Sequence, residues 1–173
     1  FDFNSQNGMI VGDDGIVLMT TNNGDNWNNY FSSSMGVYIS CIRFLNKNTG
    51  YATTGFNILK TTNSGSNWVS ITPGSLRPLS SIFIVDSNLV YAGGGISDQN
   101  SSIIKTTDGG LNWINLYPNN SVSSLSSVFF VNRDTGFCCG HSVILKTTNG
   151  GENWSSKVLG SSAIYSLYFV NAN

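Results

Sequence analysis

Side chains able to carry out acid–base or nucleophilic chemistry are scarce in this sequence. It holds one histidine, His141, and one glutamate, Glu152. A serine–histidine or metal–histidine site would have to be built around His141, and hydrolysis by paired carboxyl groups needs two acids at a fixed separation. Glu152 occupies a repeat position that elsewhere holds Asp25, Ser66 and Leu111, a variation typical of a solvated turn. The sequence therefore predicts no identifiable enzyme active site.

The arginines do not form a predictable anion site. Arg43 lies within a predicted strand, Arg133 follows the equivalent strand of another repeat, and Arg77 lies in a loop. Three guanidinium groups at such different positions are not expected to converge on one anionic substrate group.

The cysteines predict neither a disulfide framework nor a metal site. Cys41, Cys138 and Cys139 are odd in number and lack the spacing of metal ligands. A bridge between the adjacent Cys138 and Cys139 is the alternative, but the pair replaces Ala52-Thr53 in the repeat alignment, which favours small strand residues. No metal and no cofactor are predicted.

Composition narrows the classes of partner. Hydrophobic residues make up 40% of the 173 residues, enough for a packed core, whereas charged residues make up 10% and the net charge is −1. Such a surface has no electrostatic preference for nucleic acid. The apolar runs, such as 82–85 and 128–131, are far shorter than the roughly 20 residues that span a bilayer, so membrane insertion is not expected.

An octet of residues repeats four times and organises the whole chain. Each copy has the pattern Thr-Thr-Asx-x-Gly-x-Asn-Trp, and the four copies account for all four tryptophans at intervals of about 41 to 45 residues. The residues that define the octets are Thr20, Asn22, Gly24 and Trp27; Thr61, Asn63, Gly65 and Trp68; Thr106, Asp108, Gly110 and Trp113; and Thr147, Asn149, Gly151 and Trp154.

The segments between the octets predict four short strands per repeat, which we call strands A to D in chain order. In the second repeat they are expected at about 39–45, 50–54, 57–62 and 67–72, and they show no helical periodicity. Four strands in such a period is the size of one blade of a β-propeller. We therefore predict a single all-β domain of repeats at about 1–38, 39–79, 80–124 and 125–162, with 163–173 beginning a further strand A.

Each octet has a mechanical explanation. The Asx side chain can accept hydrogen bonds from backbone N–H groups of its own turn, and the fifth residue, a glycine, can adopt a positive φ. The turn between strands C and D is thereby fixed. The tryptophan that follows is expected to fill the gap between neighbouring sheets.

These octets resemble the Asp-box, also called the bacterial neuraminidase repeat, and the longer string around Lys146 to Trp154 is similar to repeats of photosystem II assembly and stability factors. Only Asp108 matches the signature aspartate, and asparagine replaces it in the other three copies. The resemblance implies a β-propeller fold. It implies little about activity, because the Asp-box is a structural turn in sialidases, xyloglucan-degrading enzymes, sorting receptors and assembly factors alike.

Strand order predicts where binding would occur. The A–B and C–D turns leave a blade at one end, which we call the octet face, and the B–C and D–A connections leave it at the other, the loop face. The irregular segments at 31–37, 73–78, 96–102 and 118–123 all fall on the loop face, the usual place for recognition on a rigid scaffold. The candidate binding residues there are Asp13, Asp14, Arg77, Asp98, Tyr117 and His141; solvent-exposed connectors are the alternative interpretation.

Two functions are consistent with these observations. The first is a non-catalytic propeller that binds a protein or a surface polysaccharide through its loop face, in a secreted, periplasmic or cell-surface protein; a photosystem assembly factor is a narrower form of it. The alternative is a segment of a carbohydrate-active enzyme, sialidase-like or xyloglucanase-like, whose catalytic acids lie outside this chain. In that case Tyr30, Phe31 and Tyr117 could line a glycan path.

The two ends of the sequence align with the same strand. Phe3-Asn4 and Val170-Asn171 both correspond to Leu45-Asn46, near the end of strand A. We expect an excerpt of a larger propeller, since strand A carries bulky residues such as Phe44 that suit a wide ring. The alternative is a closed four-bladed ring in which 162–171 pairs with the strand around Gly8 to Gly12.

Overall fold

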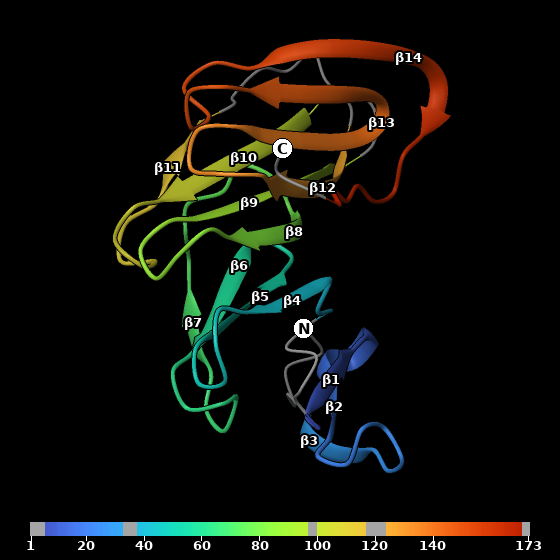
Figure 1. Ribbon diagram of the computed structural model, residues 1–173, viewed down its shortest axis with the longest axis vertical. Coiled ribbons are helices and arrows are strands. Elements are labelled where there is room, and N and C mark those ends of the chain that lie inside the picture. The colour runs from blue at the N-terminus through green and yellow to red at the C-terminus, as the bar shows by residue number, and fades with distance from the viewer. Residues whose placement is uncertain (1–5, 33–37, 97–99, 117–123, 171–173) are drawn as a thin grey trace.

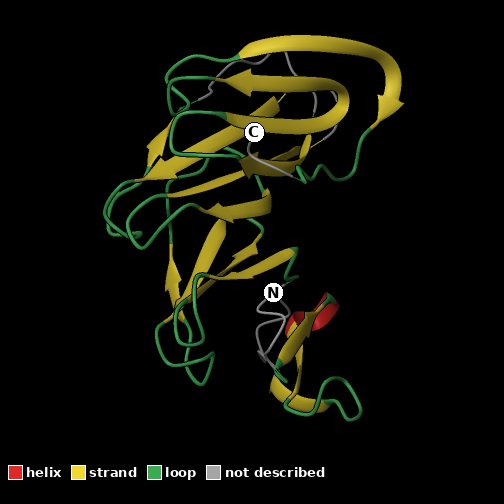
Figure 2. Cartoon of the chain, in the orientation of Figure 1, coloured by secondary structure: helices red, strands yellow, loops and turns green. Residues whose placement is uncertain are grey.

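The structure is a computed structural model that describes residues 6–32, 38–96, 100–116 and 124–170 (Figure 1). The described chain consists of antiparallel β-sheets, joined by turns and one short 3-10 turn, η1 (Asp13–Gly15) (Figure 2).

The sheets follow the four sequence repeats, and we call them blades 1 to 4. Blade 1 comprises β1 (Gly8–Val11), β2 (Ile16–Thr20) and β3 (Asn28–Ser32); blade 2 comprises β4 (Cys41–Phe44), β5 (Gly50–Thr54), β6 (Asn57–Thr61) and β7 (Val69–Ile71); blade 3 comprises β8 (Leu79–Ile84), β9 (Val90–Ile96), β10 (Asn100–Thr106) and β11 (Ile114–Asn115); blade 4 comprises β12 (Leu125–Phe130), β13 (Gly136–Thr147) and β14 (Ser155–Ala163).

Blade 2 has the four strands that the sequence predicts. Its strands lie in the order β4-β5-β6-β7, and each pairs with the next in antiparallel register, with Ile42 opposite Ala52, Ala52 opposite Leu59 and Leu59 opposite Ser70. Alternate residues of each strand face the preceding and the following blade. Each blade is therefore buried on both faces when it has a neighbour on each side.

Blades 1 and 4 differ in strand count without departing from this pattern. In blade 4 the single element β13 doubles back on itself and supplies both strand B and strand C (Figure 1). The reversal lies at His141 and Ser142, and Ser142 has a φ of 63°. In blade 1 the strands β1, β2 and β3 take positions B, C and D, and the predicted strand A falls on residues 1–5, outside the described residues.

The core lies between the blades and not within any one sheet. Val17 of blade 1 packs with Ile39 and Ala52 of blade 2. Two larger clusters join blade 2 to blade 3 and blade 3 to blade 4, and they contain the fully buried Tyr51 and Tyr91. Apolar burial therefore holds successive blades together.

Trp68, Trp113 and Trp154 pack against these three inter-blade clusters, one tryptophan in each. The prediction that the octet tryptophans fill the gaps between sheets is confirmed for these three. Trp27 is different: it is 40% exposed, because the described residues place no blade before blade 1.

The four blades follow one another along an open arc, with blade 1 at one end and blade 4 at the other (Figure 1). No strand pairing joins the described residues 162–170 to the segment from Gly8 to Gly12. The ring-closing alternative therefore has no support in the described part of the chain. None of the described residues forms a helix long and apolar enough to cross a membrane.

Candidate functional site

The four octet turns share one hydrogen-bonding scheme, seen clearly in blade 2. The Thr61 hydroxyl donates to Asn63 Oδ1 at 3.0 Å and accepts the Gly65 N–H at 2.9 Å, while Asn63 Oδ1 also accepts the Asn67 N–H at 2.9 Å. Equivalent bonds occur in the other three blades. Gly24, Gly65, Gly110 and Gly151 have φ values of 96°, 88°, 96° and 87°. The turn mechanism predicted from the sequence is confirmed, and it works with asparagine as well as with aspartate.

Asp108 is the one charged residue at the Asx position. Its second oxygen accepts an additional hydrogen bond from Asn112 Nδ2 at 2.8 Å. The backbone N–H and the side-chain amide of Asn112, together with the Thr106 hydroxyl, lower the pKa of Asp108 to about 2. The carboxylate therefore stays ionised and accepts hydrogen bonds that fix the octet turn.

The residue before each octet glycine also has a left-handed backbone, which the sequence analysis did not predict. The φ values are 60° at Asn23, 62° at Ser64, 69° at Gly109 and 65° at Gly150. Only the Gly-Gly pairs of the third and fourth octets gave a signal for it. The N–H groups of these residues donate to the A–B turn of the same blade, for example Ser64 to Asn48 O at 2.9 Å.

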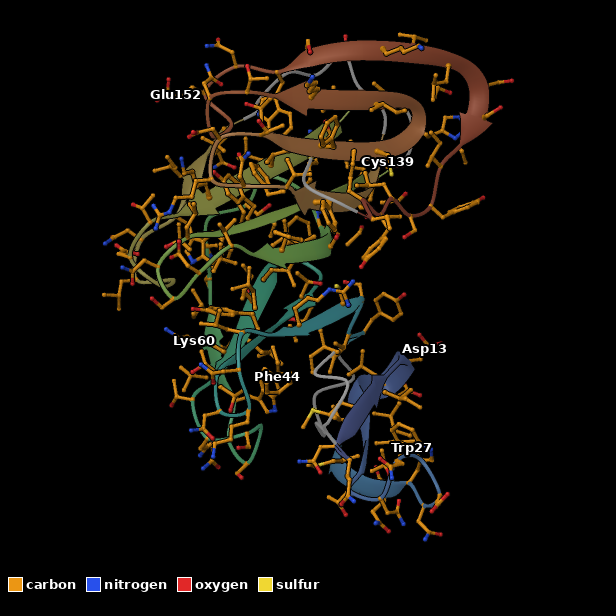
Figure 3. The ribbon with its side chains drawn as sticks, viewed as in Figure 1. Asp13, Trp27, Phe44, Lys60, Cys139 and Glu152 are labelled. Atoms are coloured by element: carbon orange, nitrogen blue, oxygen red, sulfur yellow. The ribbon has the colours of Figure 1, made fainter. Side chains whose placement is uncertain are left out.

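These bonds place the A–B and C–D turns at one end of each blade, as strand order predicts. The same bond links Gly109 to Asn88 and Gly150 to Asp134. In blade 4, Figure 3 shows Glu152, within the octet, and Cys139, near the β13 reversal, at opposite ends of the sheet. The octet face and the loop face are therefore two distinct ends of the molecule.

A second repeated contact crosses between blades. Tyr51 Oη and Lys60 Nζ of blade 2 both donate to Gly109 O of blade 3, at 2.9 and 2.6 Å, and the ammonium lies 5.4 Å from the Tyr51 ring centroid. Tyr91 and Lys105 of blade 3 hold Gly150 O of blade 4 in the same way, both at 3.0 Å. We call this arrangement the Lys–Tyr clamp.

Burial raises the pKa of Tyr91 to about 12, and the charge of Asp134 adds to the effect. The clamp hydroxyl therefore remains a hydrogen-bond donor at neutral pH. Sequence reasoning missed the clamp, although the lysine before each of the last three octets was visible in the repeat alignment.

A cavity of about 520 Å³ lies beside the first clamp, between β7 and the octet turn of blade 3. Its lining includes Val69, Ile71, Leu111 and Lys60. Because the Lys60 ammonium is already bound to Gly109 O, the cavity offers mainly apolar walls to a ligand.

The loop face carries the residues that sequence reasoning proposed for binding, but it does not bring them together. Asp13 and Asp14 are exposed in η1, and His141 is exposed at the β13 reversal. Arg77 is half-buried and donates to Leu76 O at 3.2 Å. No hydrogen bond or ion pair joins any two of these four residues in the described part of the chain, and Asp98 and Tyr117 lie outside it.

Large apolar side chains on the same face were missed as a group by the sequence analysis. Tyr38 is 58% exposed, Phe56 53%, Leu76 58% and Ile96 56%. Tyr38 and Leu76 lie in D–A connections, Phe56 lies in the B–C turn of blade 2, and Ile96 ends strand B of blade 3. Sequence patterns alone do not identify this set, because what its members share is the end of the blade at which each of them lies.

The loops of this face rest on a rigid base. Leu79, at the start of strand A in blade 3, donates its N–H to Gly55 O of blade 2 at 2.7 Å. At Gly94 and Gly140 the incoming connection passes so close that an added Cβ would lie 2.1 Å from Pro78 O and 1.9 Å from Ser124 O. Only glycine fits at these crossings, so the connections are held firmly against the blades.

The described residues show no arrangement for metal or thiol chemistry. No three His, Cys, Asp or Glu side chains among them are grouped so that they could hold a metal ion. Cys138 and Cys139 are free and buried, and burial raises the pKa of both thiols. Arg133 forms an ion pair with Asp86 at 2.5 Å on the octet face, away from Arg77 in its loop.

Comparison with known proteins identifies the fold. No model of a protein family matches the sequence, and no curated protein matches it. Among solved structures, an ancestral GH74 enzyme superposes with a TM-score of 0.71 at 19% identity, covering 87% of this chain and 22% of that chain. YCF48 from Cyanidioschyzon merolae superposes with a TM-score of 0.71 at 14% identity, covering 96% and 59%.

A further structure, of YCF48 bound to D1 peptide, has a TM-score of 0.56 at 12% identity and covers 98% of this chain and 85% of that chain. This chain thus spans 22% of the GH74 enzyme and 59% of the Cyanidioschyzon protein. The similar structures are β-propellers, and the chain has the β-propeller fold. At such low identity, the likeness establishes the fold and nothing about activity.

Proposed function

We propose that this chain is a non-catalytic β-propeller module that binds a protein segment through its loop face. The observation that carries the proposal is the set of exposed apolar side chains at one end of the molecule: Tyr38, Phe56 and Leu76 in connections and Ile96 at the end of a strand. Exposed large apolar side chains gathered on one face are typical of protein-binding surfaces.

The expected affinity is moderate. Burying the exposed part of four such side chains would contribute about 1 kcal/mol or more for each, and the cost of association would leave a dissociation constant on the order of micromolar. With a net charge of −1, binding would depend only weakly on salt. Asp13, Asp14, Arg77 and His141 would form a polar rim that orients the partner.

The structure of YCF48 bound to D1 peptide supports a protein partner, since a propeller of similar fold binds a peptide in it. A role in photosystem assembly is the narrower form of this proposal. We also propose an extracytoplasmic location, on the grounds of the low charge and the surface rich in asparagine and serine. Detection of the native protein in a periplasmic or secreted fraction would test the location.

The binding proposal is tested by panning a phage-displayed peptide library on the immobilised chain. Selected peptides are then measured against a loop-face variant, Phe56→Ser with Leu76→Ser, and a matched octet-face variant, Val69→Ser with Leu111→Ser. All four side chains are exposed, so both variants should fold. The proposal expects at least a tenfold loss of affinity for the loop-face variant alone. Loss in the octet-face variant only would move the site to the cavity beside Lys60, and equal loss in both variants would contradict a site confined to the loop face.

A segment of a carbohydrate-active enzyme is the second candidate, favoured by the likeness to the GH74 enzyme. In that case the catalytic acids would lie on parts of the protein outside this chain, and the loop face would contribute to a glycan path. Calorimetric titration with xyloglucan oligosaccharides separates the two candidates. Saturable binding that is lost in the Phe56→Ser, Leu76→Ser variant would favour the enzyme segment over the protein-binding module.

A further inference from the structure

Strand β7 is the outermost strand of blade 2 and has one open edge (Figure 1). Among the described residues it pairs with β6 alone. Blade 2 has a neighbouring blade on each side, so this edge is a feature of the sheet and not of either end of the chain. An open edge presents main-chain donors and acceptors to which an extended peptide can pair.

The register of β7 turns the main-chain groups of Ser70 towards the open edge. Alternate residues of an antiparallel pair exchange both main-chain hydrogen bonds. In blade 3, Leu116 stands at the position of Ile71 and donates its N–H to Ile103 O at 2.8 Å. Ile71 and Val69 are therefore the residues bonded to β6, and the N–H and C=O of Ser70, between them, point away from it.

The side chains of β7 that face blade 3 are apolar. Val69 and Ile71 line the cavity of about 520 Å³ together with Leu111 of the octet turn in blade 3. Val69 is 67% exposed and Leu111 is 81% exposed. Because side chains alternate along a strand, every second side chain of an added strand would lie on this side, over the cavity.

The same place is not apolar at the other two interfaces between blades. Between blades 3 and 4, Glu152 stands at the position of Leu111, opposite Ile114. Between blades 1 and 2, Asn28 and Ser66 stand at the two positions. Among the described blades, the apolar pair is therefore specific to the interface between blades 2 and 3.

The cavity also carries a positive charge. Lys60 Nζ donates to Gly109 O at 2.6 Å, which uses one of the three N–H groups of an ammonium. The one ion pair among the described residues joins Arg133 to Asp86, so no carboxylate there neutralises Lys60. Lys60 lies opposite Val69 in the register and therefore on the same face of the sheet. A carboxylate on that face of an added strand would complement the charge.

We propose that the open edge of β7 binds an extended segment of a partner protein, which adds to blade 2 as a fifth strand. An aliphatic side chain of the segment enters the cavity between Val69 and Leu111. An acidic side chain two residues away, and so on the same face, meets Lys60. Main-chain hydrogen bonds to Ser70 supply affinity, and the two side chains supply specificity. The site does not involve the loop face and does not depend on the function proposed for it.

Panning a phage-displayed peptide library on the Phe56→Ser, Leu76→Ser variant separates this site from the loop face, because that variant lacks two of the exposed loop-face side chains. The selected peptides should share an aliphatic and an acidic residue two positions apart. Replacing the acidic residue of a selected peptide by its amide should weaken binding about threefold or more at low salt. Calorimetric titration of the purified variant with synthetic peptides measures both.

Two matched substitutions in that same background test the cavity. Leu111→Glu copies Glu152 of blade 4 and should lower the affinity about tenfold or more, because it places a carboxylate in the apolar cavity beside Lys60. Ile114→Ser changes an exposed apolar side chain at the position of Val69 in blade 3 and should leave the affinity unchanged.

Ser70→Pro tests the main-chain pairing. Proline removes the outward N–H of Ser70 but none of the hydrogen bonds to β6, so the variant should unfold near the parent temperature and lose binding. If it fails to fold, Leu111→Glu still decides. Affinity that survives Leu111→Glu would overturn the proposal, and so would a library that yields binders for the wild-type chain but none for the Phe56→Ser, Leu76→Ser variant. The second result would leave the function proposed for the loop face intact.

Discussion

The interface between blades 1 and 2 lacks a set of contacts that the next two interfaces share. Between blades 2 and 3, Tyr51 and Lys60 hold the carbonyl of Gly109. The corresponding positions at the first interface hold Met9, Met19 and Ser64. Methionine cannot donate a hydrogen bond, so blade 1 is held to blade 2 by apolar packing and by main-chain bonds such as that from Ile39 to Gly12.

The repeat therefore contains two kinds of interaction, those within one octet turn and those between neighbouring blades. The octet turn has the same hydrogen bonds in every blade, because all of its donors and acceptors lie within a few residues of one another. The clamp joins residues about 45 to 60 positions apart in sequence. It forms only where the preceding blade supplies both the tyrosine and the lysine. The hydrogen bonds of the octet turn are thus the same in all four blades, whereas the contacts between neighbouring blades differ.

The largest expected effect concerns the tryptophan at the interface without a clamp. Trp68→Ala should lower the free energy of unfolding by about 3 kcal/mol, because a large side chain packed against Val17, Ile39 and Ala52 is lost from an interface that has no clamp. Trp27→Ala, at a 40% exposed position, should cost less than about 1 kcal/mol. Urea unfolding and hydrogen exchange of blade 1 amides measure both. If Trp68→Ala unfolds at the wild-type urea concentration, the tryptophans do not join the blades.

The next effect concerns the clamp itself. Tyr51→Met with Lys60→Met makes the second interface resemble the first, and it should cost about 2 kcal/mol, since one neutral and one charged hydrogen bond to Gly109 O are lost. Tyr51→Phe alone is the control and should cost about 1 kcal/mol or less, as Phe137 occupies the same position in blade 4. The reverse graft, Met9→Tyr with Met19→Lys, should stabilise blade 1 against hydrogen exchange. A double variant as stable as Tyr51→Phe would assign no stabilising role to the lysine.

A smaller effect follows from the backbone of the octet. Ser64 has a φ of 62° where the third and fourth blades have glycine, so Ser64→Gly should stabilise the protein by about 0.5 to 1 kcal/mol as the strain at a positive φ is relieved. The loss of the 3.2 Å bond from Ser64 Oγ to Asn48 Oδ1 reduces this gain. Thermal unfolding compares it with Ser70→Gly in β7, where glycine should destabilise the strand. Equal shifts in the two variants would mean that the positive φ at Ser64 carries no cost.

The smallest effect is a pH dependence confined to blade 3. The folded state lowers the pKa of Asp108 to about 2, so the ionised side chain contributes stability that is fully present above its unfolded pKa of about 4 and is lost as the pH falls towards 2. Asp108→Asn should therefore be slightly less stable than wild type at pH 7 and should equal it near pH 2. Asn149 in blade 4 provides the natural precedent for the substitution. A stability difference that stays constant from pH 7 to pH 2 would show that the charge has no role in the turn.

Much of the fold follows from the sequence alone. The octet period, the four short strands of blade 2 and the turn chemistry around Asn63 were predicted, and the strands agree within a few residues. The assignment of the octets to one end and of Asp13 and His141 to the other also follows, since strand order in an antiparallel sheet fixes the end at which each turn lies.

The sequence predicted the face on which the candidate site lies, but not the set of residues that forms it. Asp13, Asp14, Arg77 and His141 do lie on the loop face, yet the exposed apolar side chains of Phe56 and Leu76 there were not foreseen as a group. Polar residues stand out in loops of a sequence, whereas an exposed apolar residue looks the same as a buried one until its surroundings are known.

What the sequence determined by itself is whatever depends on neighbours along the chain: the octet turn, the strand pattern and the order of connections. What only the tertiary structure decided is whatever depends on the adjacent blade. It covers Trp68, it gives Lys60 and Lys105 an acceptor on the next blade, and it buries Ala52. The physical reason is that each blade is apolar on two faces and can bury either face only against another blade, so the surroundings of these residues depend on contacts far apart in sequence.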